Sequence, residues 1–436
     1  MKKIFYIEDT PANKISYYLL LVFLVTLPFD RLYSELSLIG LLLHTLLHPE
    51  TGRKLSFRWA GWLVAALFVF MLISSVYTPH FSDAWRELEK QLALLLFPLI
   101  AWYSKLDWTR VRAPLLKAFA FSCFFTVVYL YGCAFVSIHQ QGLGWRALFT
   151  PDFLNHSFTA PIDLHATYFA MDLGISLIVV VVSGLKSDSV LVKWGYGLMA
   201  LLLLAAIVQL ASRAVCIAML VVINVLIPWL LLKGRARRIA LVVFVLLSLL
   251  SVALVTTNKV LYMRYLVSLK QDVQVVPGRV EDPEPRMVRW GCAWELIKGS
   301  PWIGYGAGAE VNRLKEKYLT HHLMLSYTHE LNAHNQFLSY WLNTGVAGVL
   351  LYLGVLVAGA IVAYRRRDIL LSGFIVMILS VSFSENILDT NKGIFFFSFF
   401  FILFLCPVPV VESPFGSSDR IFVRRSEKRR VQSHYA

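Results

Sequence analysis

Twelve mostly apolar segments divide the chain, and their length limits what it can fold into. A hydrocarbon core about 30 Å thick is crossed by about 20 residues of α-helix. Because 58% of the residues are hydrophobic and only 16% are charged, too little polar sequence remains to cover a soluble core built from these segments. We therefore predict an all-α polytopic membrane protein with about twelve transmembrane helices. The segments are Ser16–Asp30, Leu36–His48, Ala60–Tyr77, Leu88–Tyr103, Pro114–Ile138, Ile162–Ser183, Gly195–Ala211, Ala214–Leu232, Ile239–Thr256, Thr344–Tyr364, Ile369–Asp389 and Gly393–Val411.

The positive charges predict how these helices are oriented. The formal charge of +14 would suggest nucleic-acid binding only if the location of the charges were ignored. With the N-terminus in the cytoplasm, 24 of the 41 Lys and Arg residues fall on the cytoplasmic side, and most of the others lie in one long loop. Short cytoplasmic loops of membrane proteins are enriched in Lys and Arg. We therefore place both termini in the cytoplasm and interpret the basic tail, residues 412–436, as a topology anchor near anionic lipid.

The longest polar segment separates two groups of helices. Residues 257–333 form a loop that this topology places in the periplasm, and loops of such length are usually either functional or disordered. Its three tryptophans and many apolar residues predict a partly helical, ordered cap. We thus expect nine transmembrane helices in residues 1–256, then this loop, and then a re-entrant half-helix with three more transmembrane helices in residues 334–411.

Charged and imidazole side chains gather at the outer ends of the predicted helices. Arg213 stands between the seventh and eighth segments with only Ser212 beside it, and an arginine in hydrocarbon costs a few kcal/mol on insertion scales. It is therefore either an anion-binding residue or a snorkelling topology anchor. Further candidates for substrate binding on this side are His165, Glu385 and Asp389 near segment ends and Arg146 in a shorter outer loop.

His334 and Asn335 begin the half-helix where the long loop returns to the membrane. A neutral imidazole, with an unperturbed pKa near 6.5, can accept a proton from a hydroxyl group, which makes His334 a candidate general base. The alternative is an ordinary polar helix cap. A zinc site would need the other histidines of the loop, and their spacing is poor for joint ligation. We expect no metal ion and no cofactor.

Arg286 and Arg289 are three residues apart and would share one face of a helix. Two guanidinium groups on one face repel each other unless an acid or a phosphate lies between them. They could pair with acids of the loop such as Glu281, Asp282 or Glu284. Alternatively they form a diphosphate clamp, for which the forked donors of arginine are well shaped. The residues alone do not favour one of these interpretations.

The run Gly304-Tyr-Gly-Ala-Gly308 is interpreted as a flexible turn. A glycine loop that cradles phosphate would follow a strand, and no strand precedes this run. The sequence therefore gives no sign of a nucleotide site.

The order of these motifs resembles that of the O-antigen ligase and polymerase superfamily of Gram-negative inner membranes. The resemblance covers most of the chain in topology, and no single motif is specific; their order, spacing and membrane side carry it together. The motifs are Ser212-Arg213 after a long apolar helix, Arg286-Met-Val-Arg-Trp290, Lys298-Gly-Ser-Pro-Trp-Ile-Gly-Tyr-Gly-Ala-Gly308, and His334-Asn-Gln-Phe-Leu with Gly345 and Gly348.

The resemblance implies a membrane glycosyltransferase that takes a polysaccharide from undecaprenyl diphosphate in the periplasm. In ligases the acceptor is the lipid A-core oligosaccharide, and the family works without metal ion or nucleotide. By the family pattern, His334 corresponds to the catalytic histidine, Arg213 to the arginine after the long helix, and Arg289 or Arg286 to the arginine of the loop. We take His334, Arg213 and Arg289 as catalytic residues and add Arg286 and Asn335 to the substrate-binding candidates.

Three other functions compete with a ligase. An O-antigen polymerase and a protein O-oligosaccharyltransferase would use the same lipid-linked donor with another acceptor, and the sequence does not fix the acceptor. A lipid or polysaccharide transporter usually carries charges or broken helices near the bilayer midplane. The interiors of the predicted segments are nearly free of charge, with Lys117 near an inner end, which counts against transport.

Overall fold

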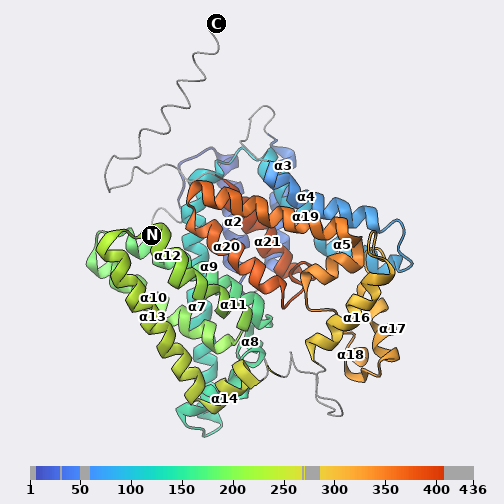
Figure 1. Ribbon diagram of the computed structural model, residues 1–436. Coiled ribbons are helices and arrows are strands. Elements are labelled where there is room, and N and C mark those ends of the chain that lie inside the picture. Colours follow the sequence, from blue (N-terminus) through green and yellow to red (C-terminus); the bar gives the residue numbers. More distant parts are fainter. Residues whose placement is uncertain (1–5, 30–31, 50–58, 268–269, 271–284, 407–436) are drawn as a thin grey trace. The chain divides into compact units, whose positions relative to one another are not determined.

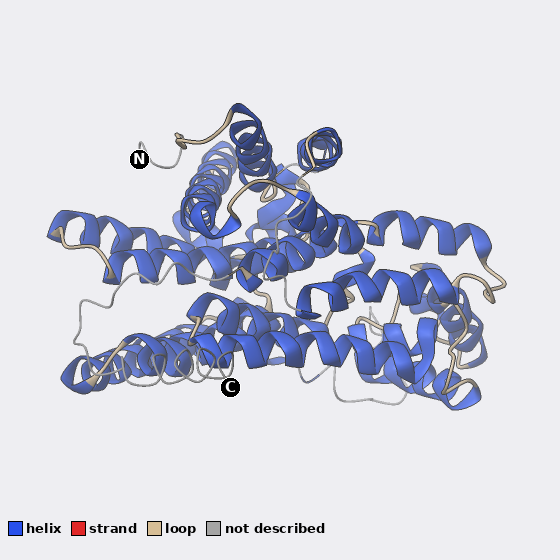
Figure 2. Ribbon diagram, turned by 90° about the horizontal axis from the view of Figure 1, so that it is seen from above, coloured by secondary structure: helices blue, strands red, loops and turns tan. Residues whose placement is uncertain are grey.

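The computed structural model describes residues 6–29, 32–49, 59–267, 270 and 285–406. Every regular element among these residues is a helix, as Figure 2 shows. Six helical stretches are long and apolar enough to cross a membrane, and five shorter apolar helices accompany them. The predicted all-α, multi-pass fold is therefore confirmed, whereas the number twelve stays a prediction. The basic tail lies outside the described residues.

The N-terminal helices follow the predicted segments with one division. The fourth segment, Leu88–Tyr103, is split at Leu92, which lies between an amphipathic helix with a polar face and an almost entirely apolar one. The helices of this part are α2 (Pro11–Thr26), α3 (Leu32–Leu47), α4 (Trp59–Ser74), α5 (Phe81–Gln91), α6 (Ala93–Tyr103) and α7 (Trp108–Gln140).

The middle of the chain begins with short helical turns and continues with long helices. The predicted division after the seventh segment is present, because Ala211 adopts a left-handed conformation (φ 50°) and ends α10. The elements are η1 (Trp145–Phe149), η2 (Pro151–Phe153), α8 (His156–Thr159), η3 (Ala160–Ile162), α9 (Ala166–Leu185), α10 (Val190–Leu210), α11 (Arg213–Val221), the π-helical η4 (Val222–Leu226), α12 (Ile227–Leu231), α13 (Gly234–Thr257), α14 (Lys259–Tyr262) and the π-helical η5 (Met263–Val267).

The described part of the long loop is helical; its helices α16 and α17 pack against each other and against α19, and α18 packs against α17 (Figure 1). Within α19, Gly345 breaks the helical conformation (φ 68°, ψ −168°). A Cβ there would lie 2.1 Å from the carbonyl oxygen of Trp302, so only glycine fits. The elements are α16 (Arg286–Gly299), α17 (Glu310–Thr320), α18 (Met324–Thr328), α19 (Gln336–Arg366), α20 (Ile369–Ser382), η6 (Ile387–Asp389) and α21 (Asn391–Leu405).

Helices α9 and α21 form the centre of the core. All residues of α21 from Gly393 to Leu405 are buried, and its phenylalanine rings pack in tilted and stacked pairs at centroid distances of 4.9 to 5.6 Å. In α9 every residue from Ala166 to Val180 is buried. One of them, Asp172, is 4% exposed and corrects the expectation that the span interiors are nearly free of charge.

Candidate functional site

A sharp turn places His334 immediately before α19. His334 has a left-handed backbone (φ 47°), which is uncommon for a residue with a side chain. Its N–H donates to Oδ1 of Asn332 at 3.0 Å. Asn335 then caps α19, because its side-chain oxygen accepts the N–H groups of Phe337 and Leu338. The predicted substrate-binding residue Asn335 thus uses its side-chain oxygen to start the helix.

His334 is paired with Glu385, which lies in the connection after α20. Nδ1 of His334 is 3.0 Å from Oε2 of Glu385. A carboxylate only accepts hydrogen bonds, so Nδ1 carries the proton and Nε2 is the basic nitrogen of the neutral ring. Burial alone would raise the pKa of Glu385, but the hydrogen bond from His334 and the nearby charge of Arg286 lower that pKa overall. The pair therefore has the form of an oriented general base.

Arg286 completes this group from the first residue of α16. One of its terminal nitrogens is 3.5 Å from Oε1 of Glu385, and the arginine side chain is 25% exposed. The acids Glu281, Asp282 and Glu284, proposed as alternative partners, lie outside the described residues. Arg286 thus contacts an acid from a different part of the chain, and this contact with the described residues uses one of its two terminal nitrogens.

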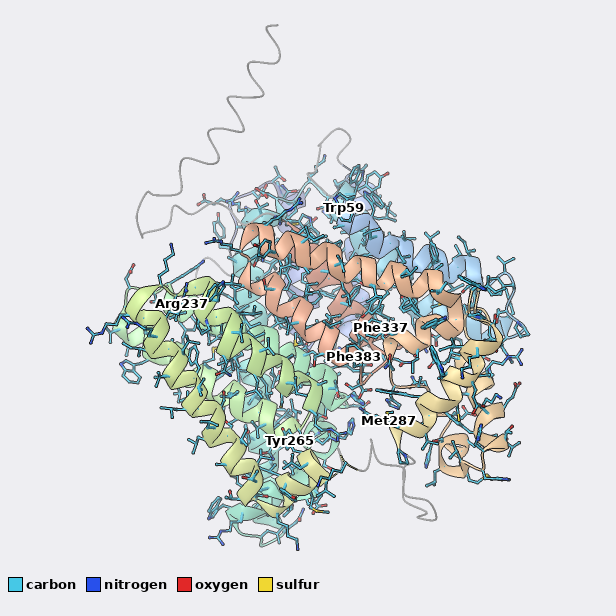
Figure 3. All side chains as sticks on the ribbon, viewed as in Figure 1. Trp59, Arg237, Tyr265, Met287, Phe337 and Phe383 are labelled. Atoms are coloured by element: carbon cyan, nitrogen blue, oxygen red, sulfur yellow. The ribbon has the colours of Figure 1, made fainter. Side chains whose placement is uncertain are left out.

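These side chains line a cavity of about 480 Å³. Arg213, Arg286 and His165 line it together with His334 and Glu385, although they come from five separate stretches of the chain. Apolar side chains also reach it, among them Met287 and Phe383, which Figure 3 labels. A volume of this size accommodates a diphosphate and part of a sugar, and pockets of about 300–1,000 Å³ are typical of ligand sites.

Arg213 reaches the cavity as the first residue of α11. The left-handed Ala211 ends α10, Ser212 leads into α11, and all three residues line the cavity. The N-terminus of a helix carries exposed N–H groups and a partial positive charge, which favour anions. The helix end and the guanidinium group therefore attract negative charge to the same place.

Two histidines from the segment before α9, His156 and His165, line one part of the cavity. His165 caps α9, with Nδ1 accepting the N–H of Thr167 at 3.3 Å. The ring of His156 packs edge-on against it, with ring centres 4.3 Å apart. Burial is the main reason that the pKa of His165 falls to about 4. Both its hydrogen bond and its low pKa make His165 a neutral group at neutral pH.

The other predicted site residues lie away from the cavity wall. Arg289 is 3% exposed, and one terminal nitrogen donates to the carbonyl oxygen of Asn332 at 3.4 Å. Asp389 accepts hydrogen bonds from Asn386 at 2.6 Å and Asn332 at 3.3 Å. Arg146 is exposed and stacks on the neighbouring Trp145 ring. In this structure these three residues contact other protein groups, and of the two loop arginines Arg286 lines the cavity and Arg289 does not.

The glycine run Gly304–Gly308 is packed between other elements and is not a free turn. All three glycines have positive φ, and a Cβ on Gly308 would lie 2.4 Å from the backbone nitrogen of Ala84. The expectation of a flexible turn is therefore corrected. Close packing, which the sequence pattern alone does not reveal, requires the glycines.

Comparison with known families connects the middle of the chain with a family of membrane proteins. Residues 198–353 match the family model described as O-antigen ligase. The match supports the assignment of this segment to the O-antigen ligase/polymerase family. The recognition made from the motifs is confirmed. The family supports a ligase- or polymerase-type function, with glycosyltransferase-like activity, in a multi-pass membrane protein. No curated protein matches the chain significantly.

Residues 198–353, which match the family model, contribute only part of the cavity lining. This segment contains Arg213, Arg286 and His334, whereas His165 precedes it and Glu385 follows it.

Sequence reasoning missed His156, Glu310 and Asn386, which the structure brings to the cavity or beneath it. The dense polar run from Ser384 to Asp389 between two apolar helices was a signal for Asn386. His156 and Glu310 had no comparable signal.

Proposed function

We propose that the protein is an O-antigen ligase that transfers O-antigen polysaccharide from undecaprenyl diphosphate to the lipid A-core oligosaccharide. The reaction takes place at the periplasmic face of the inner membrane. One observation carries the proposal: a histidine oriented by a carboxylate lines the same cavity as two arginines. The family of residues 198–353 supports the type of reaction, and the arrangement of this cavity supports its mechanism.

The reaction joins an acceptor hydroxyl group to the anomeric carbon of the donor sugar. The acceptor oxygen attacks this carbon from the face opposite the diphosphate, the bond between carbon and diphosphate oxygen breaks, and the configuration inverts in one step. The hydroxyl proton passes to Nε2 of His334, while the bonding electrons leave with the diphosphate. A positioned general base contributes roughly 10²–10⁴-fold to the rate of such a step.

Arg213 and Arg286 bind the diphosphate. Negative charge develops on the leaving diphosphate in the transition state, so donors fixed in advance stabilise the transition state more than the ground state. Each charge-assisted hydrogen bond to such a group contributes roughly 1.5–3 kcal/mol. No metal ion is needed in this mechanism, because the two guanidinium groups and the N-terminus of α11 supply the positive charge.

The rim of the cavity suits a polyprenyl chain. Ile217, Met287 and Phe383 line the cavity and are 57%, 42% and 54% exposed. They belong to three different helices or helix ends, so an apolar boundary adjoins the charged interior on several sides. A lipid-linked donor has the same division, with a charged diphosphate between an apolar chain and a polar sugar.

Reconstitution tests the proposal. The purified protein in proteoliposomes would receive undecaprenyl-diphosphate-linked polysaccharide and one acceptor at a time, and product mass would be measured. Transfer to lipid A-core oligosaccharide is expected. Extension of a second lipid-linked chain alone would identify a polymerase, and modification of a Ser- or Thr-containing protein alone would identify a protein O-oligosaccharyltransferase. Movement of the lipid-linked chain across the bilayer without a new glycosidic bond would identify a transporter.

The periplasmic orientation is tested separately. Thr320 is exposed at the end of α17, so a Thr320→Cys variant of a chain without its native cysteines can be labelled by a membrane-impermeant maleimide. Labelling from the periplasmic side of intact cells is expected. Labelling only after the cytoplasmic side is opened would reverse the orientation.

A further inference from the structure

Two separate stretches of chain meet beneath the cavity, and side-chain amides hold them together. The first contains His334, and the second contains Glu385. Oδ1 of Asn386 accepts the N–H of Asn335 at 2.7 Å. Oε1 of Gln336 accepts the N–H of Leu388 at 2.7 Å. Each stretch thus supplies a side chain that fixes the backbone of the other, in the residues that directly follow His334 and Glu385.

Glu310 joins both stretches from a third one. Its Oε1 accepts the N–H of Ala333 at 2.9 Å, next to the left-handed residue His334. The side-chain nitrogen of Asn386 donates to both oxygens of Glu310, at 3.1 and 3.3 Å. Glu310 is 4% exposed and Asn386 is 3% exposed, and neither lines the cavity.

We propose that Glu310 and Asn386 are positioning residues for His334, because together they fix the N–H groups on both sides of its left-handed turn. The proposal rests on the function proposed above. A left-handed residue with a side chain costs free energy and persists only where its surroundings impose it. The hydrogen bonds to the N–H groups of Ala333 and Asn335 impose it here, and they thereby hold the imidazole against Glu385 at the cavity.

The packed glycine turn explains how Glu310 reaches this place. Gly306 and Gly308 pass so close to α4 and α5 that a Cβ on either would lie within 3 Å of their backbone. Asn312, two residues after the start of α17, donates to Oδ2 of Asp83 on α5 at 2.9 Å. The start of α17 is therefore anchored to the N-terminal helices. Glu310, the first residue of α17, is thereby held in place where it accepts the N–H of Ala333 next to His334.

A positioning role differs from general stabilisation in how it combines with His334. If Glu310 acts only through His334, its removal has no further effect once the imidazole is gone. If Glu310 merely stabilises the fold, the two substitutions act independently and their effects on the rate multiply. A double-mutant cycle on turnover therefore separates the two roles.

The cycle uses Glu310→Ala, His334→Ala and the double variant in proteoliposomes, with kcat and donor Kd measured per folded molecule. We expect Glu310→Ala to lower kcat roughly 10- to 100-fold, because small displacements of a catalytic group cost about 10²-fold. Donor Kd should stay within about threefold, and in the His334→Ala background kcat should change less than about threefold. Equal losses in both backgrounds, or no loss in the wild-type background, would overturn the proposal.

Three further variants keep the test decisive. Glu310→Gln retains an oxygen that can accept the N–H of Ala333 and should recover most of kcat, whereas a loss equal to that of Ala would contradict the positioning role. Asn386→Ala provides the same cycle if Glu310→Ala does not fold. Glu316→Ala is the matched control, because Glu316 lies on the same helix with a 61% exposed side chain and should leave kcat unchanged. If His334→Ala alone retains full turnover, the proposed function fails instead.

Discussion

Two arginine–carboxylate contacts occur in different surroundings, and the difference distinguishes a structural ion pair from a binding site. Arg112 on α7 lies 2.7 Å from Asp368, and both side chains are 4% exposed. Arg286 lies 3.5 Å from Glu385, with side chains 25% and 11% exposed. The first pair is enclosed in protein, and the second borders the cavity.

The remaining hydrogen bonds of the two pairs differ in the same way. Arg112 also donates to the carbonyl oxygen of Cys406 at 3.1 Å, and Asp368 caps α20 by accepting the N–H groups of Leu370 and Leu371. This pair joins α7, α20 and the end of α21 through groups that are already engaged. Glu385 instead orients His334, and the Arg286 side chain remains accessible from the cavity. We infer that the first pair serves the fold and the second a ligand.

The largest effect is expected from Arg112→Ala. Removing one partner of a buried ion pair leaves an uncompensated charge and destabilises a protein by roughly 3–5 kcal/mol. The melting temperature in detergent should fall strongly, while turnover per folded molecule stays unchanged. The combination Arg112→Met with Asp368→Asn keeps the helix cap and should restore most of the stability. A loss of turnover that persists in this stable variant would break the comparison.

Arg213→Ala should act in the opposite way. Removing a donor to developing negative charge costs roughly 10²–10³-fold in kcat, and the half-buried Arg213 side chain borders the cavity at the first residue of α11. We expect turnover near the detection limit with an almost unchanged melting temperature. Arg213→Lys should recover only part of the activity, because a point charge cannot make a bidentate phosphate contact. Normal transfer by the Ala variant would reduce Arg213 to a topology anchor.

Arg286 and Arg289 offer a sharper contrast within one helix. Arg286→Ala should weaken donor binding by roughly 10- to 100-fold, which corresponds to the 1.5–3 kcal/mol of one charge-assisted hydrogen bond. Arg289→Ala should mainly lower the melting temperature, because its side chain is buried against the carbonyl oxygen of Asn332. Donor Kd and melting temperature, measured on both variants, decide the matter. The reverse pattern would return the diphosphate role to Arg289.

The smallest effect concerns pH. The pKa of His165 is about 4 in the folded protein, mainly because of burial, and near 6.5 in an unfolded chain. Between these values the unfolded state binds more protons, so stability falls as pH drops from about 6.5 towards 4. Because His165 is partly exposed, the contribution is only ~1 kcal/mol.

Melting temperatures between pH 4 and 7 check this expectation. His165→Gln should flatten the curve in that window, since glutamine does not titrate. Glu385 contributes a further loss of stability at lower pH. Its pKa is lowered in the folded protein, so the unfolded chain takes up this proton first as the pH falls. A wild-type melting temperature that is constant from pH 6.5 to 4 would contradict a buried neutral His165.

The sequence predicts the helical membrane architecture and several residues of the cavity for identifiable reasons. Apolar length determines the helices, and the isolated Ser212-Arg213 pair marks the break between α10 and α11. The sequence could not choose between Arg286 and Arg289, because the choice depends on Glu385, about a hundred residues away. The sequence did not predict the roles of Glu310 and Asn386 for the same reason. Their partners are backbone N–H groups of distant segments, which a local sequence pattern does not indicate.

The most direct test of the account separates donor binding from turnover in His334→Ala. The variant would be reconstituted with lipid-linked polysaccharide and lipid A-core acceptor, and donor Kd and the single-turnover rate would be measured on the same preparation. A general base that acts on the acceptor predicts a rate lower by roughly 10²–10⁴-fold with donor Kd unchanged. Donor binding lost together with turnover, or turnover equal to wild type, would contradict the proposed role of His334.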